Sequence, residues 1–159
     1  MIFIHGWPEI GLLWERQLNH FAALGWRCVA PDMRGYGGSS VPDDLASYAI
    51  REIVADMVEL HEVLGPAPAV WIGHDWGAPI AWSMASHHPE RCRAVIGLSV
   101  PYLARGFALP NLVPLVDRTV YPEADYPVGP WDYWLFYRER FEEAVRQFER
   151  DLPATFSVL

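Results

Sequence analysis

The sequence contains few cysteines and no cluster of basic residues. Two of its 159 residues are cysteines, Cys28 and Cys92, which form no C-x-x-C motif and are too few for a disulfide framework. Both lie in apolar segments, so we expect small buried side chains and no redox or metal chemistry. Twelve Lys and Arg against twenty Asp and Glu give a net charge of −8. Without a basic surface to neutralise phosphates, we expect no nucleic-acid partner.

Long hydrophobic runs and a recognisable leader are also missing. No apolar run approaches the roughly 20 residues that a membrane span requires. The first residues, MIFIHG, lack the basic region and the small-residue cleavage site of a signal peptide. Because 52% of the residues are hydrophobic and 14% are aromatic, a disordered chain is excluded. We therefore expect a soluble, cytoplasmic globular protein with no membrane span.

Short apolar runs alternate with segments of helical periodicity in the first 100 residues. The apolar runs predict strands at residues 1–4, 26–30, 69–72 and 94–99. The 3.6-residue periodicity predicts helices at residues 14–24, 50–64 and 78–87. Strands separated by helices of this length predict an α/β fold with a parallel sheet covered on both faces.

The composition changes near residue 100. Six prolines between positions 101 and 130 divide the chain into short pieces, and strand-like runs disappear. Helices are predicted again at residues 131–137 and 141–150. This pattern indicates an insertion or a second subdomain and not a continuation of the sheet.

The segment Gly73-His74-Asp75-Trp76-Gly77 follows a predicted strand and precedes a predicted helix. It fits the small-x-nucleophile-x-small elbow of α/β-hydrolases, with Asp75 at the tip of the turn. Larger side chains at the two glycines would collide with the neighbouring strand and helix. The backbone N–H of Trp76 would lie at a helix N-terminus, where it can stabilise negative charge. An ordinary helix with Asp75 as its N-cap is the alternative.

Two further loops follow predicted strands. His5-Gly6-Trp7-Pro8 follows the first strand, where an α/β-hydrolase has its other oxyanion-hole donor. The glycine-rich segment DMRGYGGSS at residues 32–40 follows the second strand. It is not G-x-G-x-x-G, because position 40 is Ser, so dinucleotide binding is disfavoured. All three loops should gather at the carboxyl edge of the sheet, where open α/β folds bind ligands.

Together, the segments HGWPE, DMRGYGGSS and GHDWGAPIAW resemble the epoxide hydrolase branch of the α/β-hydrolase superfamily. The later segment WDYWLFY at residues 131–137 resembles the cap domain of that branch. The resemblance implies a partial α/β-hydrolase core at residues 1–100. It also implies the start of a helical cap subdomain at residues 101–159.

The resemblance also implies roles for individual residues. Asp75 matches the nucleophile, which opens an epoxide by forming an ester with the enzyme. Tyr133 matches a cap tyrosine that donates a proton to the epoxide oxygen. The backbone N–H groups of Trp7 and Trp76 match the oxyanion hole, and Pro8 would hold the first loop rigid. The implied substrate is a small apolar epoxide in a pocket of Trp7, Pro8, Trp76 and Tyr133, without a cofactor or metal.

Nearby residues allow other assignments. His5 and His74 flank the predicted site, and we expect both to be structural and not proton carriers. We expect Arg34 to support the site by pairing with a buried acid. Tyr126 and Tyr137 are alternatives to Tyr133 as the functional tyrosine.

The second half-reaction of the family requires a histidine base and its acid, which follow the nucleophile in α/β-hydrolases. Only His87 and His88 follow Asp75, and they end the helix that leaves the elbow. The sequence therefore resembles the central part of a longer enzyme. We expect it to form the ester but to hydrolyse it very slowly.

Two other functions remain open. Haloalkane dehalogenases also have an Asp nucleophile followed by Trp, but they carry Asn where this chain has Trp7; Tyr133 favours the epoxide. A catalytically incomplete remnant that binds apolar ligands is the second alternative, and the missing histidine favours it.

Overall fold

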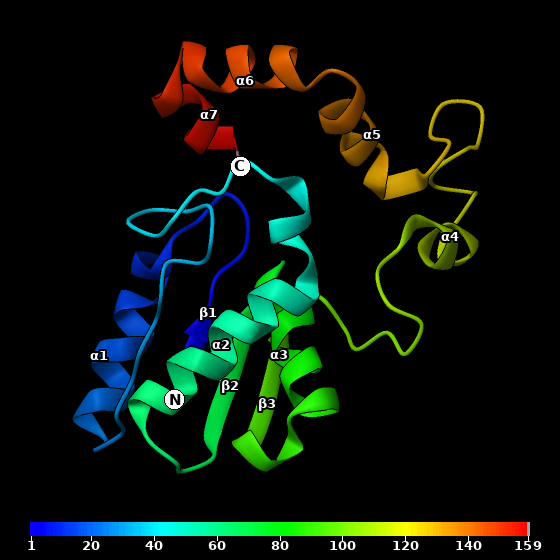
Figure 1. Cartoon of the computed structure of the whole chain (residues 1–159). Helices are drawn as coiled ribbons and strands as arrows, with labels where there is room; N and C mark the ends of the chain where they lie inside the picture. The colour runs from blue at the N-terminus through cyan, green and yellow to red at the C-terminus, as the bar shows by residue number, and fades with distance from the viewer. Residues whose placement is uncertain (159) are drawn as a thin grey trace. The chain divides into compact units, whose positions relative to one another are not determined.

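The computed structural model describes residues 1–158, and the chain divides into two compact units after Leu103. The core unit is Met1–Leu103 and the second unit begins at Ala104 (Figure 1). No helix within the described residues is both long and apolar enough to cross a membrane.

A parallel sheet of three strands forms the centre of the core unit. Strands β1 (Ile2–Ile4), β2 (Ala69–His74) and β3 (Cys92–Leu98) lie in the order β1-β2-β3. Ile2 pairs with Trp71, which pairs in turn with Val95 on the other side. Parallel neighbours require crossover connections, and helices supply them here. The predicted α/β fold is confirmed.

One face of this sheet is covered by two helices. Helix α2 (Ile50–Leu64) and helix α3 (Gly77–His87) pack on the face that carries Ile2, Ile4 and Trp71. Side chains alternate along a strand, so these three residues share a face while Phe3 and Ile72 point to the opposite one. The predicted helices at residues 50–64 and 78–87 are confirmed, and α3 begins one residue earlier than expected.

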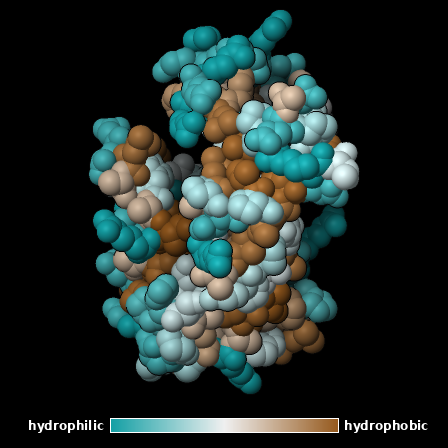
Figure 2. Space-filling view, turned by 90° about the vertical axis from the view of Figure 1, so that its right-hand side faces the viewer, coloured by the Kyte–Doolittle hydropathy of each residue, from teal (hydrophilic) through white to brown (hydrophobic). Residues whose placement is uncertain are grey.

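The opposite face is covered only in part. Helix α1 (Glu15–Ala23), preceded by a 3₁₀ turn at Gly11–Trp14, packs against Phe3 and Ile72. Ile96 and Leu98 of β3 are 44% and 42% exposed. Figure 2 shows the molecule from the right-hand side of Figure 1, and hydrophobic residues (brown) are exposed on that side. The expectation of a sheet covered on both faces is therefore wrong for β3.

The predicted strand at residues 26–30 is absent as a strand. Only Val29 forms a bridge, because its N–H donates to Met1 O and its carbonyl accepts from Phe3 N, at 3.0 and 2.9 Å. Trp26 is 38% exposed. The apolar run thus reaches the edge of β1 at a single position, and apolar character alone does not provide a hydrogen-bonding partner for its other residues.

Short 3₁₀ turns connect several elements of the core unit. One spans Leu45–Tyr48 before α2, and Asp44 caps it by accepting a hydrogen bond from Ala46 N at 3.2 Å. Another spans Pro89–Arg91 between α3 and β3. Cys92 and Cys28 are free and only partly buried. The expectation that both are buried is therefore wrong in degree, because Cys28 lies outside the named strands and Cys92 begins the outer strand β3.

The second unit is a series of short helices. The predicted helices at residues 131–137 and 141–150 correspond to α5 (Asp132–Glu139) and α6 (Phe141–Arg150). Two further helices that the sequence pattern did not predict are α4 (Leu109–Leu112) and α7 (Leu152–Val158). The remaining 3₁₀ turns span Val113–Leu115 and Gly129–Trp131.

Candidate active site

Asp75 lies in the tight turn between the last residue of β2 and the first residue of α3. Its backbone φ is +49°, a left-handed conformation that Asp adopts more readily than most non-glycine residues. The turn is held from both sides, because Asp75 N donates to Leu98 O at 3.3 Å and Ala78 N donates to Asp75 O at 3.0 Å. The backbone therefore holds the carboxylate at the tip of a rigid turn.

The two glycines of the elbow, Gly73 and Gly77, lie where the backbone of one segment closely approaches the backbone of another. A Cβ added at Gly73 would lie 2.6 Å from Ala78 Cα, and one added at Gly77 would lie 2.7 Å from His5 O. Neither neighbour is a flexible side chain, so a larger residue would force the strand and helix apart. The small residues are required so that α3 can start directly against β1 and β2.

The loop after β1 brings a backbone donor to Asp75. Trp7 N donates a hydrogen bond to Asp75 Oδ1 at 2.9 Å. A Cβ at Gly6 would collide with the Asp75 side chain, so this position must lack one. The Trp7–Pro8 peptide bond is cis. Trp76 immediately precedes α3, so its N–H belongs to the positively polarised end of that helix.

His5 connects this loop to the loop after residue 31. It is 2% exposed. Met33 N donates to its Nε2 at 2.8 Å, and its Nδ1 lies 2.8 Å from Gly6 O. An acceptor at Nε2 and a carbonyl partner at Nδ1 require the neutral ring with its proton on Nδ1. These contacts support the structural role that we expected for His5.

Asp32 holds the glycine-rich loop. Its two carboxylate oxygens accept hydrogen bonds from Gly11 N at 2.8 Å and from Gly38 N at 2.9 Å. These backbone donors, Gly38 foremost, hold the pKa of Asp32 below its ordinary value. One carboxylate thus ties two loops that are distant in sequence.

Arg34 forms the ion pair that the sequence suggested. Its Nε donates to Asp56 Oδ2 at 2.8 Å, and its second terminal nitrogen, Nη2, contacts the other carboxylate oxygen. A further bond runs from Arg34 Nη1 to Ser47 O at 3.1 Å. The acid lies on α2 and is partly exposed, so the expectation that it is buried is wrong.

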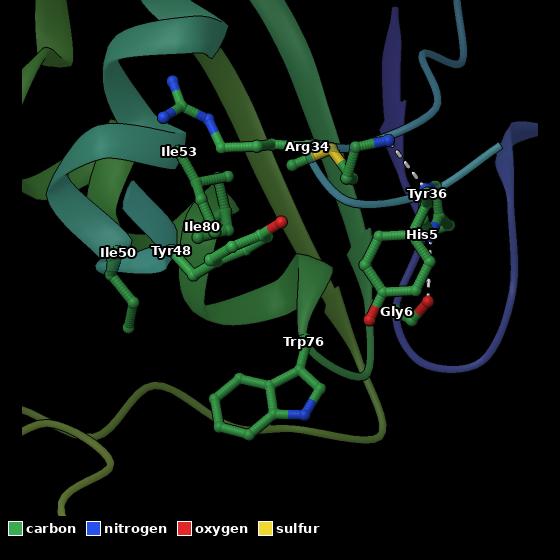
Figure 3. A pocket seen from close by; sticks show the side chains of 10 residues that line it. His5, Gly6, Arg34, Tyr36, Tyr48, Ile50, Ile53, Trp76 and Ile80 are labelled. Carbon is green, nitrogen blue, oxygen red and sulfur yellow. Dashed lines mark hydrogen bonds between the residues drawn. The ribbon is translucent and has the colours of Figure 1, made fainter. Parts of the chain in front are cut away.

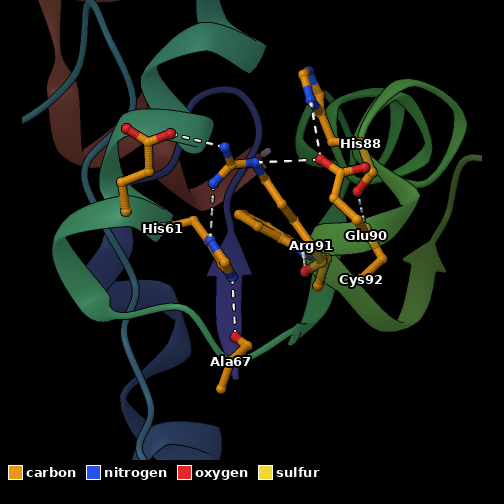
Figure 4. Close-up of polar contacts among 8 residues, drawn as sticks. His61, Ala67, His88, Glu90, Arg91 and Cys92 are labelled. Carbon is orange, nitrogen blue, oxygen red and sulfur yellow. Dashed lines mark hydrogen bonds and ion pairs between the residues drawn. The ribbon is translucent and has the colours of Figure 1, made fainter.

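His61 and His74 form polar contacts with residues other than Asp75. His74 Nδ1 lies 3.1 Å from Glu9 Oε2. Arg91 Nη1 donates a hydrogen bond to His61 Nδ1 at 3.3 Å, so the ring proton of His61 is on Nε2. This Nε2 donates to Ala67 O at 3.0 Å (Figure 4). Since α3 rises roughly 1.5 Å per residue, His87 at its last position lies far from the elbow.

Tyr133 belongs to α5 in the second unit. It is 43% exposed, and its ring contacts the rings of Trp134 and Tyr137 with centroids 5.9 and 5.5 Å apart. Burial raises the pKa of Tyr137, and Tyr133 adds to that shift. The alternative residue Tyr126 contacts Tyr121 with centroids 5.6 Å apart.

Tyr36 was not selected as a site residue from the sequence. Its partly buried ring packs edge-on against His5 with centroids 5.0 Å apart. Burial raises the pKa of its hydroxyl, and the negative charge of Asp75 contributes. The available signal was its position directly after Arg34-Gly35, in a glycine-rich loop that the sequence predicts at the carboxyl edge of the sheet. Of the predicted pocket residues, Trp76 lines the same cavity as Tyr36.

Within residues 1–158, no three His, Cys, Asp or Glu side chains group as metal ligands would. The core unit instead presents a carboxylate held at a strand–helix turn beside backbone donors. A carboxylate is chemically able to act as a nucleophile, and backbone N–H groups are able to stabilise negative charge that develops beside them.

Comparisons with known proteins find similar sequences and a similar solved structure that are all named as epoxide hydrolases. "Epoxide hydrolase B" of Mycobacterium tuberculosis is 38% identical over 96% of this chain, and "Epoxide hydrolase" of Caballeronia sordidicola is 46% identical over 67%. The chain spans only 43% and 32% of the lengths of those relatives. A crystal structure of an epoxide hydrolase from Vigna radiata superposes on 77% of this chain with a TM-score of 0.66 and 37% identity, over 39% of its own length.

The family assignment follows from the fold, the elbow and a sequence-family model. The model of the alpha/beta hydrolase fold matches residues 1–157. This match agrees with the parallel sheet and with the strand–turn–helix that carries Asp75. The chain belongs to the α/β-hydrolase fold family.

Proposed function

We propose that this chain is the nucleophile-bearing part of an epoxide hydrolase, with Asp75 as the nucleophile. The observation that carries the proposal is the hydrogen bond from Trp7 N to Asp75 Oδ1. It engages Oδ1 of the carboxylate, and we assign the attack on the substrate to Oδ2. The relatives named as epoxide hydrolases support the same substrate class.

In the proposed first step, Asp75 Oδ2 attacks one carbon of the epoxide ring. A new C–O ester bond forms while the ring C–O bond breaks, and its electron pair goes to the ring oxygen. A phenol proton from Tyr133 neutralises that oxygen as a hydroxyl, and the phenolate later regains a proton from water. We assign Tyr133 to the start of the helical cap that the sequence predicts at residues 101–159, and we propose a small apolar epoxide as the substrate.

In the proposed second step, water attacks the ester and Oδ1 takes up negative charge. The N–H groups of Trp7 and Trp76 would form the oxyanion hole, since Trp7 N already donates to Oδ1. Pro8 follows Trp7 directly and would hold this donor in place. A histidine base is required for fast hydrolysis. The histidines that follow Asp75 are His87 and His88, which lie at the C-terminal end of α3, away from the elbow, so we expect ester formation without rapid turnover in this chain.

Intact-mass spectrometry after incubation with styrene oxide tests this proposal. We expect the chain to gain the mass of one epoxide molecule, because ring opening is an addition with no leaving group. Peptide sequencing should locate the ester on Asp75. Asp75→Asn should abolish the adduct, since the amide is a poor nucleophile while Asn tolerates the left-handed backbone.

The matched control is Asp43→Asn, which changes an exposed carboxylate outside the elbow and should leave adduct formation intact. Tyr133→Phe should slow adduct formation by about 10²-fold if the phenol is the proton donor. A folded chain that gains no mass, or gains it equally in Asp75→Asn, would overturn the proposal and favour the ligand-binding remnant. Release of bromide from 1-bromobutane without an epoxide adduct would favour a haloalkane dehalogenase.

A further inference from the structure

A cavity of about 260 Å³ lies beside the elbow, entirely within the core unit. It is bordered by the loop after β1, the glycine-rich loop, α2 and the start of α3 (Figure 3). Its lining residues include Tyr36, Tyr48, Ile50, Ile53, Trp76 and Ile80. Small-molecule pockets in proteins measure about 300–1,000 Å³, so this space suits one substituent of a ligand and not a large molecule.

The walls of this cavity away from Asp75 are apolar and firmly held. Ile80 is 3% exposed and Ile53 packs against the same core cluster. The Tyr48 ring is fixed because its hydroxyl donates to Pro42 O at 2.9 Å. These side chains offer hydrocarbon surface with little freedom to collapse into the space.

The charged group on the cavity wall is turned away from it. The Arg34 guanidinium pairs with Asp56 and also donates to Ser47 O. Figure 3 shows this group extending away from the rings of Tyr36 and Trp76. The cavity therefore receives the aliphatic stem of Arg34 and not its charge, and an anionic ligand gains nothing there.

The polar end of the cavity is next to the nucleophile. Gly6, which lines it, approaches Asp75 so closely that a Cβ would collide with the carboxylate. Tyr36 stands beside Gly6 and His5. Burial and the charge of Asp75 both raise the pKa of its hydroxyl, so the hydroxyl is neutral at pH 7 and can donate a hydrogen bond.

We propose that this cavity is a binding subsite for the apolar substituent of the substrate, such as an aryl or branched alkyl group. The proposal rests on the proposed function. A ligand in the cavity would direct its oxygen-bearing end toward Tyr36 and Asp75 and its hydrocarbon end toward Ile50, Ile53 and Ile80. Epoxides with a bulky apolar substituent are then preferred over small epoxides, because burying the substituent holds the ring near the nucleophile.

The test compares adduct formation on Asp75 with styrene oxide and with propylene oxide. Ile53→Trp should fill the cavity and lower the styrene oxide to propylene oxide rate ratio by about tenfold, which corresponds to about 1.4 kcal/mol. The matched control is Val63→Trp, on the same helix but 84% exposed and outside the cavity. It should leave the ratio unchanged. If Ile53→Trp fails to fold, Ile50→Trp, at a lining position that is 37% exposed, gives the same comparison.

A second measurement separates this proposal from the chemistry of Asp75. The probe is 2-(4-fluorophenyl)ethanol, which cannot form an ester by ring opening, and its ¹⁹F line width reports binding. We expect broadening with the unaltered chain and with Val63→Trp, and loss of broadening with Ile53→Trp or Ile50→Trp. Equal binding to all four would overturn the subsite even if Asp75 forms its ester. Selective binding without any ester would support the subsite and contradict the nucleophile.

Discussion

The core unit and the second unit are held together in different ways. In the core unit, strands and loops far apart in sequence exchange backbone hydrogen bonds, and the largest fully buried side chains include Trp71, Phe3 and Ile2. In the second unit, the buried hydrophobic side chains among residues 104–157 are Leu112 and Ala144. Its contacts are mostly between neighbouring short helices and aromatic rings, such as Tyr137 with Phe148 at 5.8 Å.

This difference explains why the two candidate catalytic residues have different surroundings. Asp75 lies in a turn whose glycines, Gly73 and Gly77, pack directly against the backbone of neighbouring segments. The position of the turn can therefore change little. Tyr133 is positioned by a helix of eight residues whose rings pack on one another. The carboxylate position is therefore determined by the sheet, whereas the tyrosine position depends on the packing of the short helices.

The largest effect is expected from closing the space at the elbow. Gly77→Val would place side-chain carbons against the backbone of Ile4 and His5. We expect the core unit to lose about 4 kcal/mol or more, because neither neighbour can move without opening the sheet. Thermal unfolding followed by circular dichroism measures the loss.

The matched control for this change is Gly38→Ala. A Cβ at Gly38 would have its nearest neighbour, Asp32 Oδ2, at 3.9 Å, so this substitution should alter the melting temperature little. If Gly77→Val melts like the unaltered chain, the elbow is not as tightly packed as its geometry indicates.

A smaller effect is expected from removing the histidine that connects two loops of the core unit. His5→Phe keeps a ring of similar size but leaves Met33 N and Gly6 O without their partners. We expect a loss of about 2 kcal/mol, since a buried donor without an acceptor costs about 1–3 kcal/mol. Urea denaturation of this variant and of His20→Phe, which changes an exposed residue of α1, provides the comparison. An equal loss in both variants would assign the effect to the phenylalanine and not to the missing bonds.

The smallest effect on stability is expected from removing the charge of one carboxylate in each unit. Asp32 accepts from two loops, whereas Asp117 accepts from Thr119 two residues away. The pKa of each is lowered by these bonds. A lowered pKa means that the charged form stabilises the fold, so this contribution is present above the ordinary pKa of 3.8 and is lost as the pH falls through the lower folded value.

Asp32→Asn should therefore destabilise the core unit by about 1 kcal/mol at pH 7 and by less at pH 3. Asp117→Asn should have a weaker effect with the same pH dependence, because an exposed local turn can re-form in the unfolded chain. Urea midpoints at both pH values measure this. A larger effect for Asp117→Asn would contradict the contrast drawn between the two units.

Much of the core unit is predictable from the pattern of residues. The helix at residues 50–64 follows from its apolar face, and the elbow follows from two glycines around Asp75 after a strand. The strand predicted at residues 26–30 is wrong, because an apolar run does not reveal whether a partner strand lies beside it. The glycine-rich loop was expected at the same sheet edge as Asp75, but Tyr36 was missed because a local pattern does not reveal which side chain of a loop turns toward the elbow.

By itself, the sequence determined the α/β fold class and the positions of its main helices, because periodicity and glycine spacing are local properties. It also determined which residue types stand at the ends of the strands. Only the tertiary structure decided that Trp7 N donates to Asp75, that His5 joins two loops and that a cavity remains beside the elbow. Trp7 and Asp75 are 68 residues apart, and the cavity is lined by residues as distant as His5 and Ile80. Such contacts are set by packing of the whole unit and not by local pattern.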